Sequence, residues 1–399
     1  MDSWEKTYIR IWIAQFTSIM GFAFALPFAP FYIQELGVTD PAEVKVWVSL
    51  FAAATPLALA IFSPLWGAAA DRFGHRLMML RANFSAVGVL MLMGMVRSVE
   101  ALIILRLMQG ALTGTLTAAQ IMVAANAPPE KTGRALGALT ASVFSGAMFG
   151  ASLGGFFSEW MGYRAVFFVA AGLLFVASCL ILFGTKEIAV EPVTNDIHTE
   201  QEDSSGGSRR AFWAVFPIML LIVGVSYARQ FDMAMMPLLV QEIHGTLDGV
   251  SVRTGALLAV GSIAGMLSGF MLGRLADHMN PARLSIACAV MAALSMIPQA
   301  FASAVWVLFP ARFLMMFCSG GLEAITQAWL SQATDRRYKG IIFGWASTAR
   351  SIGWVLGPLS SGAVGTLLGI RPVYVASTIL FLLTVPLIIV TASRVSRKR

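Results

Sequence analysis

Two acidic side chains, Asp232 and Glu323, lie inside long apolar stretches of the sequence, where a carboxyl group can take up or release a proton away from bulk water. Arg106, Arg229 and Arg350 are basic side chains in similar surroundings. Charged groups are costly in an apolar medium, so they usually face a polar interior or one another, and they often mark the path of a proton or a solute. These residues are therefore the first candidates for chemistry.

Glu323 and Arg350 are expected to form a pair. With a rise of about 1.5 Å per residue, Glu323 lies eight residues from the inner end of the apolar run 305–331, and Arg350 lies nine residues from the inner end of the run 341–366. Their depths agree within about one helical turn. Each would otherwise be an unpaired charge among apolar side chains.

Asp232 has two interpretations. It follows Arg229 by three residues, so the two side chains would share a helical face and form a local pair. Alternatively, Asp232 lines the outer half of a cavity as a carboxylate that titrates during function. The sequence alone leaves both interpretations open.

Uncharged amides within the apolar runs are further candidates for contact with a solute, although such amides also join helices to one another through hydrogen bonds. We expect these amides to line a substrate cavity together with Arg229 and Arg350. These amides are Gln15, Asn83, Gln120 and Gln327.

The composition shows that water is not the only solvent of this chain. Of the 399 residues, 57% are hydrophobic and 12% are charged, and the mean hydropathy is +0.75, whereas soluble domains are about a quarter charged. Runs of about 20 apolar residues, the length that crosses a bilayer, predict an all-α membrane protein with twelve transmembrane helices. The runs are 8–33, 46–70, 77–96, 100–124, 136–158, 163–184, 213–240, 253–276, 283–302, 305–331, 341–366 and 370–392.

The basic residues predict how these helices are oriented. If both termini are cytoplasmic, 19 of the 28 Lys and Arg residues lie in cytoplasmic segments, and short cytoplasmic loops retain positive charge during insertion. We therefore expect both termini in the cytoplasm. The net charge of +7 does not predict a nucleic-acid partner, because these residues lie in short loops rather than on one soluble face.

An internal repeat divides the chain. The segment GAAADRFGHR beginning at Gly67 is echoed 206 residues later by GRLADHMNPAR beginning at Gly273, and Arg106 is echoed at the same offset by Arg312. Six helices form an even number, so the second copy has the same orientation as the first. The repeat predicts two pseudo-symmetric six-helix bundles with a substrate site near the bilayer midplane between them.

The repeat also defines the expected domains. We expect bundles at residues 1–184 and 213–399. Residues 185–212 are hydrophilic and contain the run Ser-Ser-Gly-Gly-Ser, which is typical of a flexible linker. The linker is expected to lie in the cytoplasm.

The segment GAAADRFGHR resembles the signature loop between the second and third spans of the major facilitator superfamily, with His75 where a basic residue is usual. The resemblance implies the major facilitator fold and a latch that holds one gate state. In this latch, Gly67 would let two helices approach and Asp71 would accept backbone donors at a neighbouring helix N-terminus. The alternative is a positively charged anchor that fixes topology. The expected gating residues are Gly67, Asp71, Arg72, Gly74 and Arg76, with Gly273 and Asp277 in the second copy.

Arg106 and Gly110 resemble the Arg-x-x-x-Gly element of proton-coupled exporters in this superfamily. The resemblance implies that Arg106 assists proton coupling alongside the carboxylates Asp232 and Glu323; the alternative is a structural, hydrogen-bonding arginine. Because the spans of the first half contain no acidic residue except Glu35 at an edge, Arg106 is expected to face across the cavity.

Small residues at four-residue spacing occur in the fifth and eleventh runs. Gly146, Gly150 and Gly154 resemble an element associated with antiporters, with Ala151 where that element has proline, and Gly357 with Pro358 occurs in the eleventh run. The alternative is a plain surface for packing helices together.

Nearly the whole chain resembles the twelve-span drug/proton antiporters, in particular the multidrug efflux proteins of the MdtG type; the segments LPFAPFYIQELGV and FGWASTARSIGWVLG carry this resemblance together with the signature loop. It implies proton-coupled export of drug-like or amphiphilic small molecules through the bacterial inner membrane by alternating access, with a proton gradient in place of a cofactor. The expected partners are the substrate, protons and the lipid bilayer, and we expect a monomer. The alternatives are export of an endogenous metabolite, such as a sugar or a siderophore, and uptake by proton symport.

Other classes of function fit less well. No lysine lies in a Gly-x-x-x-x-Gly-Lys phosphate-binding loop, and the four histidines and three cysteines are spread along the chain rather than gathered with carboxylates. We therefore expect neither an enzyme, nor an ATP-driven pump, nor a metal site. A receptor or scaffold would need no polar residues in the middle of its spans.

Overall fold

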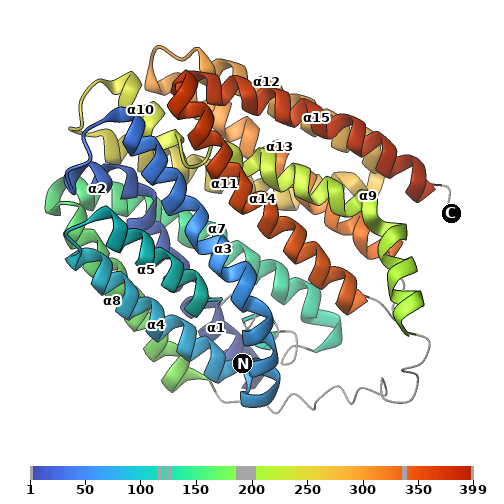
Figure 1. Ribbon diagram of the computed structural model, residues 1–399. Coiled ribbons are helices and arrows are strands. Elements are labelled where there is room, and N and C mark those ends of the chain that lie inside the picture. The colour runs from blue at the N-terminus through green and yellow to red at the C-terminus, as the bar shows by residue number, and fades with distance from the viewer. Residues whose placement is uncertain are drawn as a thin grey trace. The chain divides into compact units, whose positions relative to one another are not determined.

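The computed structural model describes residues 3–114, 119–120, 122–123, 128–185, 204–334 and 339–396 (Figure 1). Every regular element in these ranges is a helix. The first half of the sequence forms α1 (Ser3–Ala25), the short 3₁₀ helix η1 (Leu26–Phe28), α2 (Ala29–Glu35), α3 (Pro41–Phe73), α4 (His75–Met95), α5 (Val99–Leu112), α7 (Pro129–Met161) and α8 (Tyr163–Gly184). The second half forms α9 (Ser204–Phe231), α10 (Met236–His244), α11 (Val250–His278), α12 (Pro281–Ala300), α13 (Val305–Ala333), α14 (Lys339–Leu368) and α15 (Ile370–Ser396).

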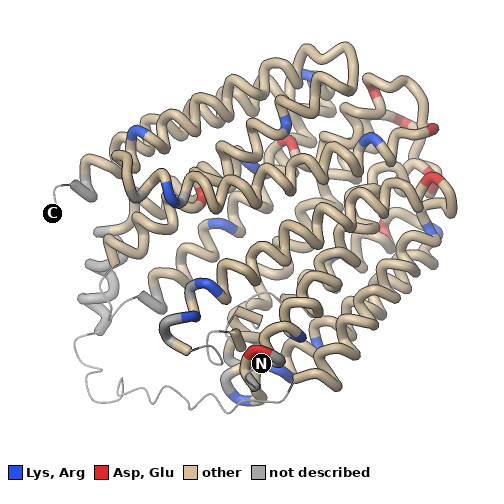
Figure 2. The backbone as a smooth tube through the Cα atoms, turned by 180° about the vertical axis from the view of Figure 1, so that it is seen from behind, with Lys and Arg blue, Asp and Glu red and all other residues tan. Residues whose placement is uncertain are grey.

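Eleven segments within the described ranges are long and apolar enough to cross a bilayer, and they coincide with eleven of the twelve predicted runs. The remaining run, 100–124, begins in α5 and continues into residues 115–118, which lie outside the described ranges. Figure 2 also shows how apolar these helices are, because long stretches of helix carry no charged residue. The chain is an all-α membrane protein, as predicted.

Two glycines at equivalent positions of the repeat form tight connections between helices. Gly162 joins α7 to α8 with a φ of 79°, and Gly369 joins α14 to α15 with a φ of 96°. Side chains with a Cβ rarely adopt such angles, so glycine is the favoured residue at both turns. The two positions are 207 residues apart, which extends the repeat from the sequence to the backbone.

In the first half, α7 lies against α1 along a row of glycines at four-residue spacing. A Cβ atom on Gly146, Gly150 or Gly154 would lie 2.6, 2.4 or 2.1 Å, respectively, from a backbone oxygen of α1. Real Cβ atoms do not approach backbone so closely, so these positions bring the two helices into direct backbone contact.

The second half repeats this arrangement between α14 and α9. A Cβ atom on Gly353 would lie 2.7 Å from the backbone nitrogen of Tyr227, and one on Gly357 would lie 3.1 Å from Gln230. Within each half, an equivalent helix completes the packing: α8 contacts α1 and α4, and α15 contacts α9 and α12. The two copies therefore share a common skeleton of helix contacts.

Contacts between residues divide the chain into two units. The first unit contains Met1–Val193 with Val240–Ile263, and the second contains Thr194–Leu239 with Ala264–Arg399. In this division, residues 240–263 group with the first half, although they were expected in the C-terminal bundle. Most of the predicted linker, 185–212, lies outside the described residues.

The segment Val240–Ile263 joins the first unit through close contacts with α7. A Cβ atom on Gly255 would lie 2.3 Å from the backbone oxygen of Ala151. The backbone nitrogen of Ser251 donates a hydrogen bond of 2.9 Å to Glu159 Oε1. The start of α11 is thus held by the first unit, and the rest of the helix belongs to the second.

Two glycines of α7 should respond oppositely to the same substitution. Gly154→Ala places a methyl group against a backbone oxygen of α1, which should destabilise the protein by about 1–3 kcal/mol. Gly137→Ala is the matched control, because a Cβ atom there meets no heavy atom within 4 Å and alanine favours a helix over glycine by about 1 kcal/mol. Thermal unfolding in detergent should show a lower Tm for Gly154→Ala and an equal or higher Tm for Gly137→Ala; equal Tm values for both variants would contradict the packing described.

Candidate functional site

Glu323 on α13 lies between two arginines from two other helices. Arg229 on α9 donates through Nη1 to Glu323 Oε2, and the Arg350 Nε on α14 lies 3.3 Å from Glu323 Oε1. The predicted pair of Glu323 with Arg350 is therefore formed. The second arginine, Arg229, was expected beside Asp232 instead.

The triad joins three helices through one carboxylate. Each oxygen of Glu323 faces a different guanidinium, so the single negative charge serves as the counter-ion of both arginines. The side chains of Glu323, Arg229 and Arg350 are 33%, 22% and 27% exposed, respectively, so none of the three is fully enclosed by the helices. Protonation of Glu323 would remove the charge that holds both arginines, which links proton binding to the arrangement of α9, α13 and α14.

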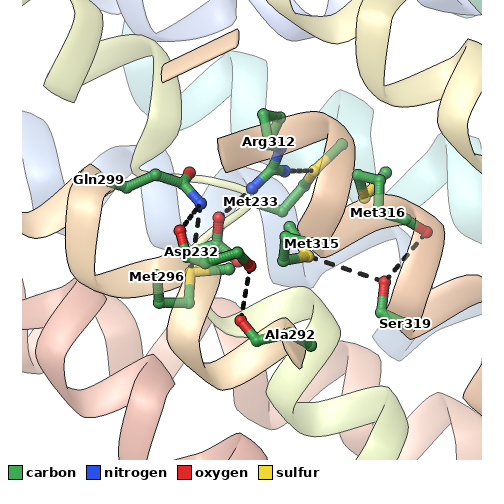
Figure 3. A network of polar contacts seen from close by, with 10 residues as sticks. Asp232, Met233, Ala292, Met296, Gln299, Arg312, Met315, Met316 and Ser319 are labelled. Carbon is green, nitrogen blue, oxygen red and sulfur yellow. Dashed lines mark hydrogen bonds and ion pairs between the residues drawn. The ribbon is translucent and has the colours of Figure 1, made fainter. Parts of the chain in front are cut away.

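Asp232 forms a different pair, with Arg312 of α13. Arg312 Nη1 donates to Asp232 Oδ2, and its Nη2 lies 2.9 Å from the sulfur of Met233 (Figure 3). The side chains of Asp232 and Arg312 are 0% and 1% exposed. The local pair of Asp232 with Arg229 is therefore not formed, and the side chain of Asp232 is buried rather than exposed at a surface. The reason is local, because α9 ends at Phe231 and Asp232 no longer continues the helical face of Arg229.

The surroundings of the Asp232–Arg312 pair are largely apolar. Figure 3 shows the sulfur atoms of Met296 and Met315 close to the pair, together with Gln299, whose amide nitrogen donates to the backbone oxygen of Ser295 at 3.0 Å. Asp232 Oδ1 is buried and has no hydrogen-bond partner in the described part of the chain. Asp232 and Arg312 therefore neutralise one another inside the helix contact, and neither side chain is exposed.

Arg106 on α5 is also buried, and its partners are uncharged. Its Nη1 donates to the side-chain oxygen of Gln109, its Nε donates to the backbone oxygen of Phe51 at 3.2 Å, and its guanidinium lies 4.3 Å from the centre of the Phe51 ring. The expectation that Arg106 faces across a cavity is therefore wrong. The neighbouring Gly110 allows close contact, because a Cβ atom there would lie 2.2 Å from the backbone oxygen of Thr55.

The four amides expected in a substrate cavity differ in their surroundings. Asn83 is buried, accepts a hydrogen bond of 2.8 Å from Ser18 and thereby joins α4 to α1. Gln15 is also buried, and neither of its amide atoms has a hydrogen-bond partner among the described residues. Gln120 is exposed and Gln327 is half-buried.

The structure places part of the signature loop. Gly74 joins α3 to α4 with a φ of 90°, Arg72 lies exposed beside Phe73, and Arg76 Nη2 donates to the backbone oxygen of Leu182 at 2.6 Å.

Gly67 does not have the expected role, because a Cβ atom there would meet nothing within 4 Å, and so it marks no close approach of helices. Asp71 lies in α3, whereas Gly273 and Asp277 lie in α11. The surroundings of all three residues are outside the described part of the structure. Pro358 lies buried inside α14 beside Gly357.

Sequence reasoning missed two residues that complete these sites. Arg312 was recognised only as the repeat counterpart of Arg106, although a buried arginine and a buried aspartate in the same half are natural partners. Gln109 follows Arg106 by three residues, a spacing that places both on one helical face. Within the described residues, no group of three or more His, Cys, Asp or Glu side chains could hold a metal ion.

The long apolar helices define a multi-pass membrane protein. The family model described as Major Facilitator Superfamily matches residues 11–309 and 218–399. The chain belongs to this superfamily, whose members are transporters rather than enzymes.

Multidrug resistance proteins are similar to this chain over nearly its whole length. The multidrug resistance protein MdtG of Salmonella paratyphi A is 32% identical over 383 residues, which cover 95% of this chain and 94% of that protein. The protein of the same name from Salmonella arizonae is 31% identical over the same shares.

Solved structures share the fold at low sequence identity. The nucleoside transporter NupG superposes with a TM-score of 0.76 at 12% identity, covering 96% of this chain and 99% of NupG. A bacterial homolog of the human lysosomal transporter Spinster, in an inward-facing and unoccupied conformation, superposes with a TM-score of 0.75 at 12% identity. The match covers 100% of this chain and 99% of the homolog. The human organic anion transporter MFSD10 superposes with a TM-score of 0.70 at 14% identity, and the match covers 97% of this chain and 100% of MFSD10.

Removing one partner of the Asp232–Arg312 pair should destabilise the protein, and removing the second charge as well should restore most of the stability. Arg312→Met alone leaves a buried, unpaired carboxylate, and loss of one partner of a buried ion pair costs about 3–5 kcal/mol. The double variant Asp232→Asn with Arg312→Met removes both charges and should recover most of the loss. Yield and Tm of the purified proteins measure this; a double variant less stable than Arg312→Met alone would contradict the assigned pair.

Proposed function

We propose that this transporter exports drug-like or amphiphilic small molecules through the bacterial inner membrane in exchange for protons, by alternating access. The observation that carries the proposal is the position of Glu323, a partly exposed carboxylate shared by two arginines from two other helices. The similarity to multidrug resistance proteins over 95% of the chain supports export of drug-like compounds.

Glu323 is the carboxylate that we assign to proton coupling. It is the accessible member of the two candidates, since its side chain is 33% exposed and that of Asp232 is 0% exposed. Asp232 and Arg312 hold one another as a neutral pair, and Arg106 has uncharged partners. These three residues then support the helices, and Glu323 exchanges the proton.

Exchange of a proton for a substrate sets a condition on the substrate. In antiport, substrate binding must release the proton from Glu323, so the substrate has to stabilise the ionised carboxylate more than the protonated acid. Groups that donate hydrogen bonds to the carboxylate, or cations that take the place of one guanidinium, meet this condition. Arg229 and Arg350 lie within reach of the same group and are the proposed contacts for substrate polar groups.

A second candidate function follows from the charge of the triad. Two guanidiniums and one carboxylate leave a net positive charge, which would favour an anionic substrate. Because an anion beside Glu323 favours the protonated acid, proton and substrate would bind together, and the transporter would be a symporter. The direction of proton movement on substrate binding therefore distinguishes the two candidates.

The remaining features of the proposal concern topology and gating. We place both termini in the cytoplasm because of the distribution of Lys and Arg. The loop from Asp71 to Arg76, with its second copy near Asp277, acts as the latch between gate states in this proposal. The transporter acts as a monomer, and the proton gradient is its energy source.

Glu323→Gln should abolish coupled export while the protein remains folded, because the amide keeps the size and hydrogen-bonding capacity of the side chain but cannot ionise. The control is Glu100→Gln, which changes an exposed carboxylate at the start of α5. Growth of an efflux-deficient bacterial host on a panel of toxic compounds should identify compounds that wild type and Glu100→Gln tolerate and Glu323→Gln does not. Equal tolerance in Glu323→Gln at wild-type expression would remove Glu323 from the mechanism.

Compounds from that screen should release protons when they bind. In everted membrane vesicles acidified by respiration, a fluorescent pH probe reports the loss of the gradient that substrate-induced proton efflux causes. We expect this signal with wild-type protein and not with Glu323→Gln. Proton movement together with the substrate, in the same direction, would favour the symporter.

A further inference from the structure

Arg81 on α4 has an unusual environment for a charged residue in a membrane helix. Its guanidinium lies 3.3 Å from the centre of the Trp66 ring on α3, which is a cation–π contact. Its Nε and Nη1 atoms are buried and have no hydrogen-bond partner in the described part of the chain. The side chain as a whole is half-buried, and Nη2 is not among its buried, unpartnered atoms.

Neighbouring arginines show that this environment is particular to Arg81. Arg76, near the start of α4, donates to the backbone oxygen of Leu182, and Arg10 donates to that of Gly184 at 2.8 Å. Both acceptors lie in the last turn of α8, where the helix dipole favours a positive charge. Arg81 has no such acceptor, and its positive charge is not balanced by a carboxylate among the described residues.

The position of Arg81 along α4 places it close to a membrane surface. It is the seventh residue of α4, so it lies about 9 Å from the start of the helix at 1.5 Å per residue. Trp side chains are enriched at this depth, where the ring contacts hydrocarbon and the indole N–H finds a polar partner. The Trp66 Nε1 atom meets this description, because it donates to the backbone oxygen of Ala111.

Exposed apolar side chains flank the pair on both helices. On α4, Leu77 and Phe84 lie four residues before and three residues after Arg81, on the same face, and are 48% and 38% exposed. On α3, Phe62 and Leu65 precede Trp66 and are 37% and 62% exposed. A free anion needs no apolar surface, whereas a lipid has acyl chains that would cover it.

We propose that Arg81 and Trp66 bind the phosphate of an anionic phospholipid, whose acyl chains lie along the exposed faces of α3 and α4. The guanidinium supplies N–H donors and a positive charge to the phosphate, and the indole ring holds the guanidinium in place. An anionic headgroup is specified because, among the side chains that the structure describes, no carboxylate pairs with Arg81 and could hold the ammonium group of a zwitterionic lipid. This site is separate from the Glu323 triad and does not depend on the transported substrate.

Native mass spectrometry of the purified full-length chain tests the proposal, with phosphatidylglycerol and phosphatidylcholine of matched acyl chains as probes. Wild type should retain phosphatidylglycerol in preference to phosphatidylcholine. Arg81→Gln should lose about tenfold in affinity for phosphatidylglycerol, the effect of one lost charge-assisted hydrogen bond. Arg97→Gln is the control, because it removes the same charge from an exposed position beyond the other end of α4.

Two further measurements distinguish the alternatives. Arg81→Lys keeps the charge and should keep a measurable preference for phosphatidylglycerol, which separates loss of the site from misfolding. Inorganic phosphate at millimolar concentration should not displace the lipid. Unchanged phosphatidylglycerol binding in Arg81→Gln, equal losses in Arg81→Gln and Arg97→Gln, or displacement by inorganic phosphate would each overturn the proposal, the last by showing a site for free anions.

Discussion

The structure depends on one constraint: a charge within a membrane helix must be balanced inside the protein or reach the membrane surface. The chain meets this constraint in several ways. Glu323 is shared by Arg229 and Arg350, Asp232 and Arg312 neutralise one another, and Arg106 uses a glutamine and a backbone oxygen. These ion pairs differ in how far their side chains are exposed. The Asp232–Arg312 pair is buried, and the Glu323 triad, to which we assign proton coupling, is partly exposed.

The internal repeat is visible in the helix skeleton but not in the charges that lie on it. The two halves keep equivalent turns at Gly162 and Gly369 and equivalent glycine contacts between their first and fifth helices. The charges were not kept in the same way. At an offset of either 206 or 207 residues, the first-half positions equivalent to Arg229, Asp232 and Arg350 carry no charged residue. The ionic network is therefore a property of the second half, and proton coupling is expected to be asymmetric.

The sequence predicted those features that depend on position along a helix. Hydrophobic runs located the membrane helices, and the equal depths of Glu323 and Arg350 predicted their contact, because depth in a bilayer is proportional to residue number. Features that depend on which helices are neighbours could not be predicted. The spacing of Arg229 and Asp232 indicated a shared face, but α9 ends between them, and their partners come from α13. Gly67 matched a family pattern, but its Cβ position is open, because a motif does not specify the atoms that surround it.

The central claim is that Glu323 is the group that releases its proton when substrate binds. Infrared difference spectroscopy of the reconstituted protein, recorded before and after addition of a transported compound, measures this directly. The account predicts loss of a protonated carboxyl band and gain of a carboxylate band in wild type, and absence of both changes in Glu323→Gln. The same bands in Glu323→Gln as in wild type would show that another group carries the proton.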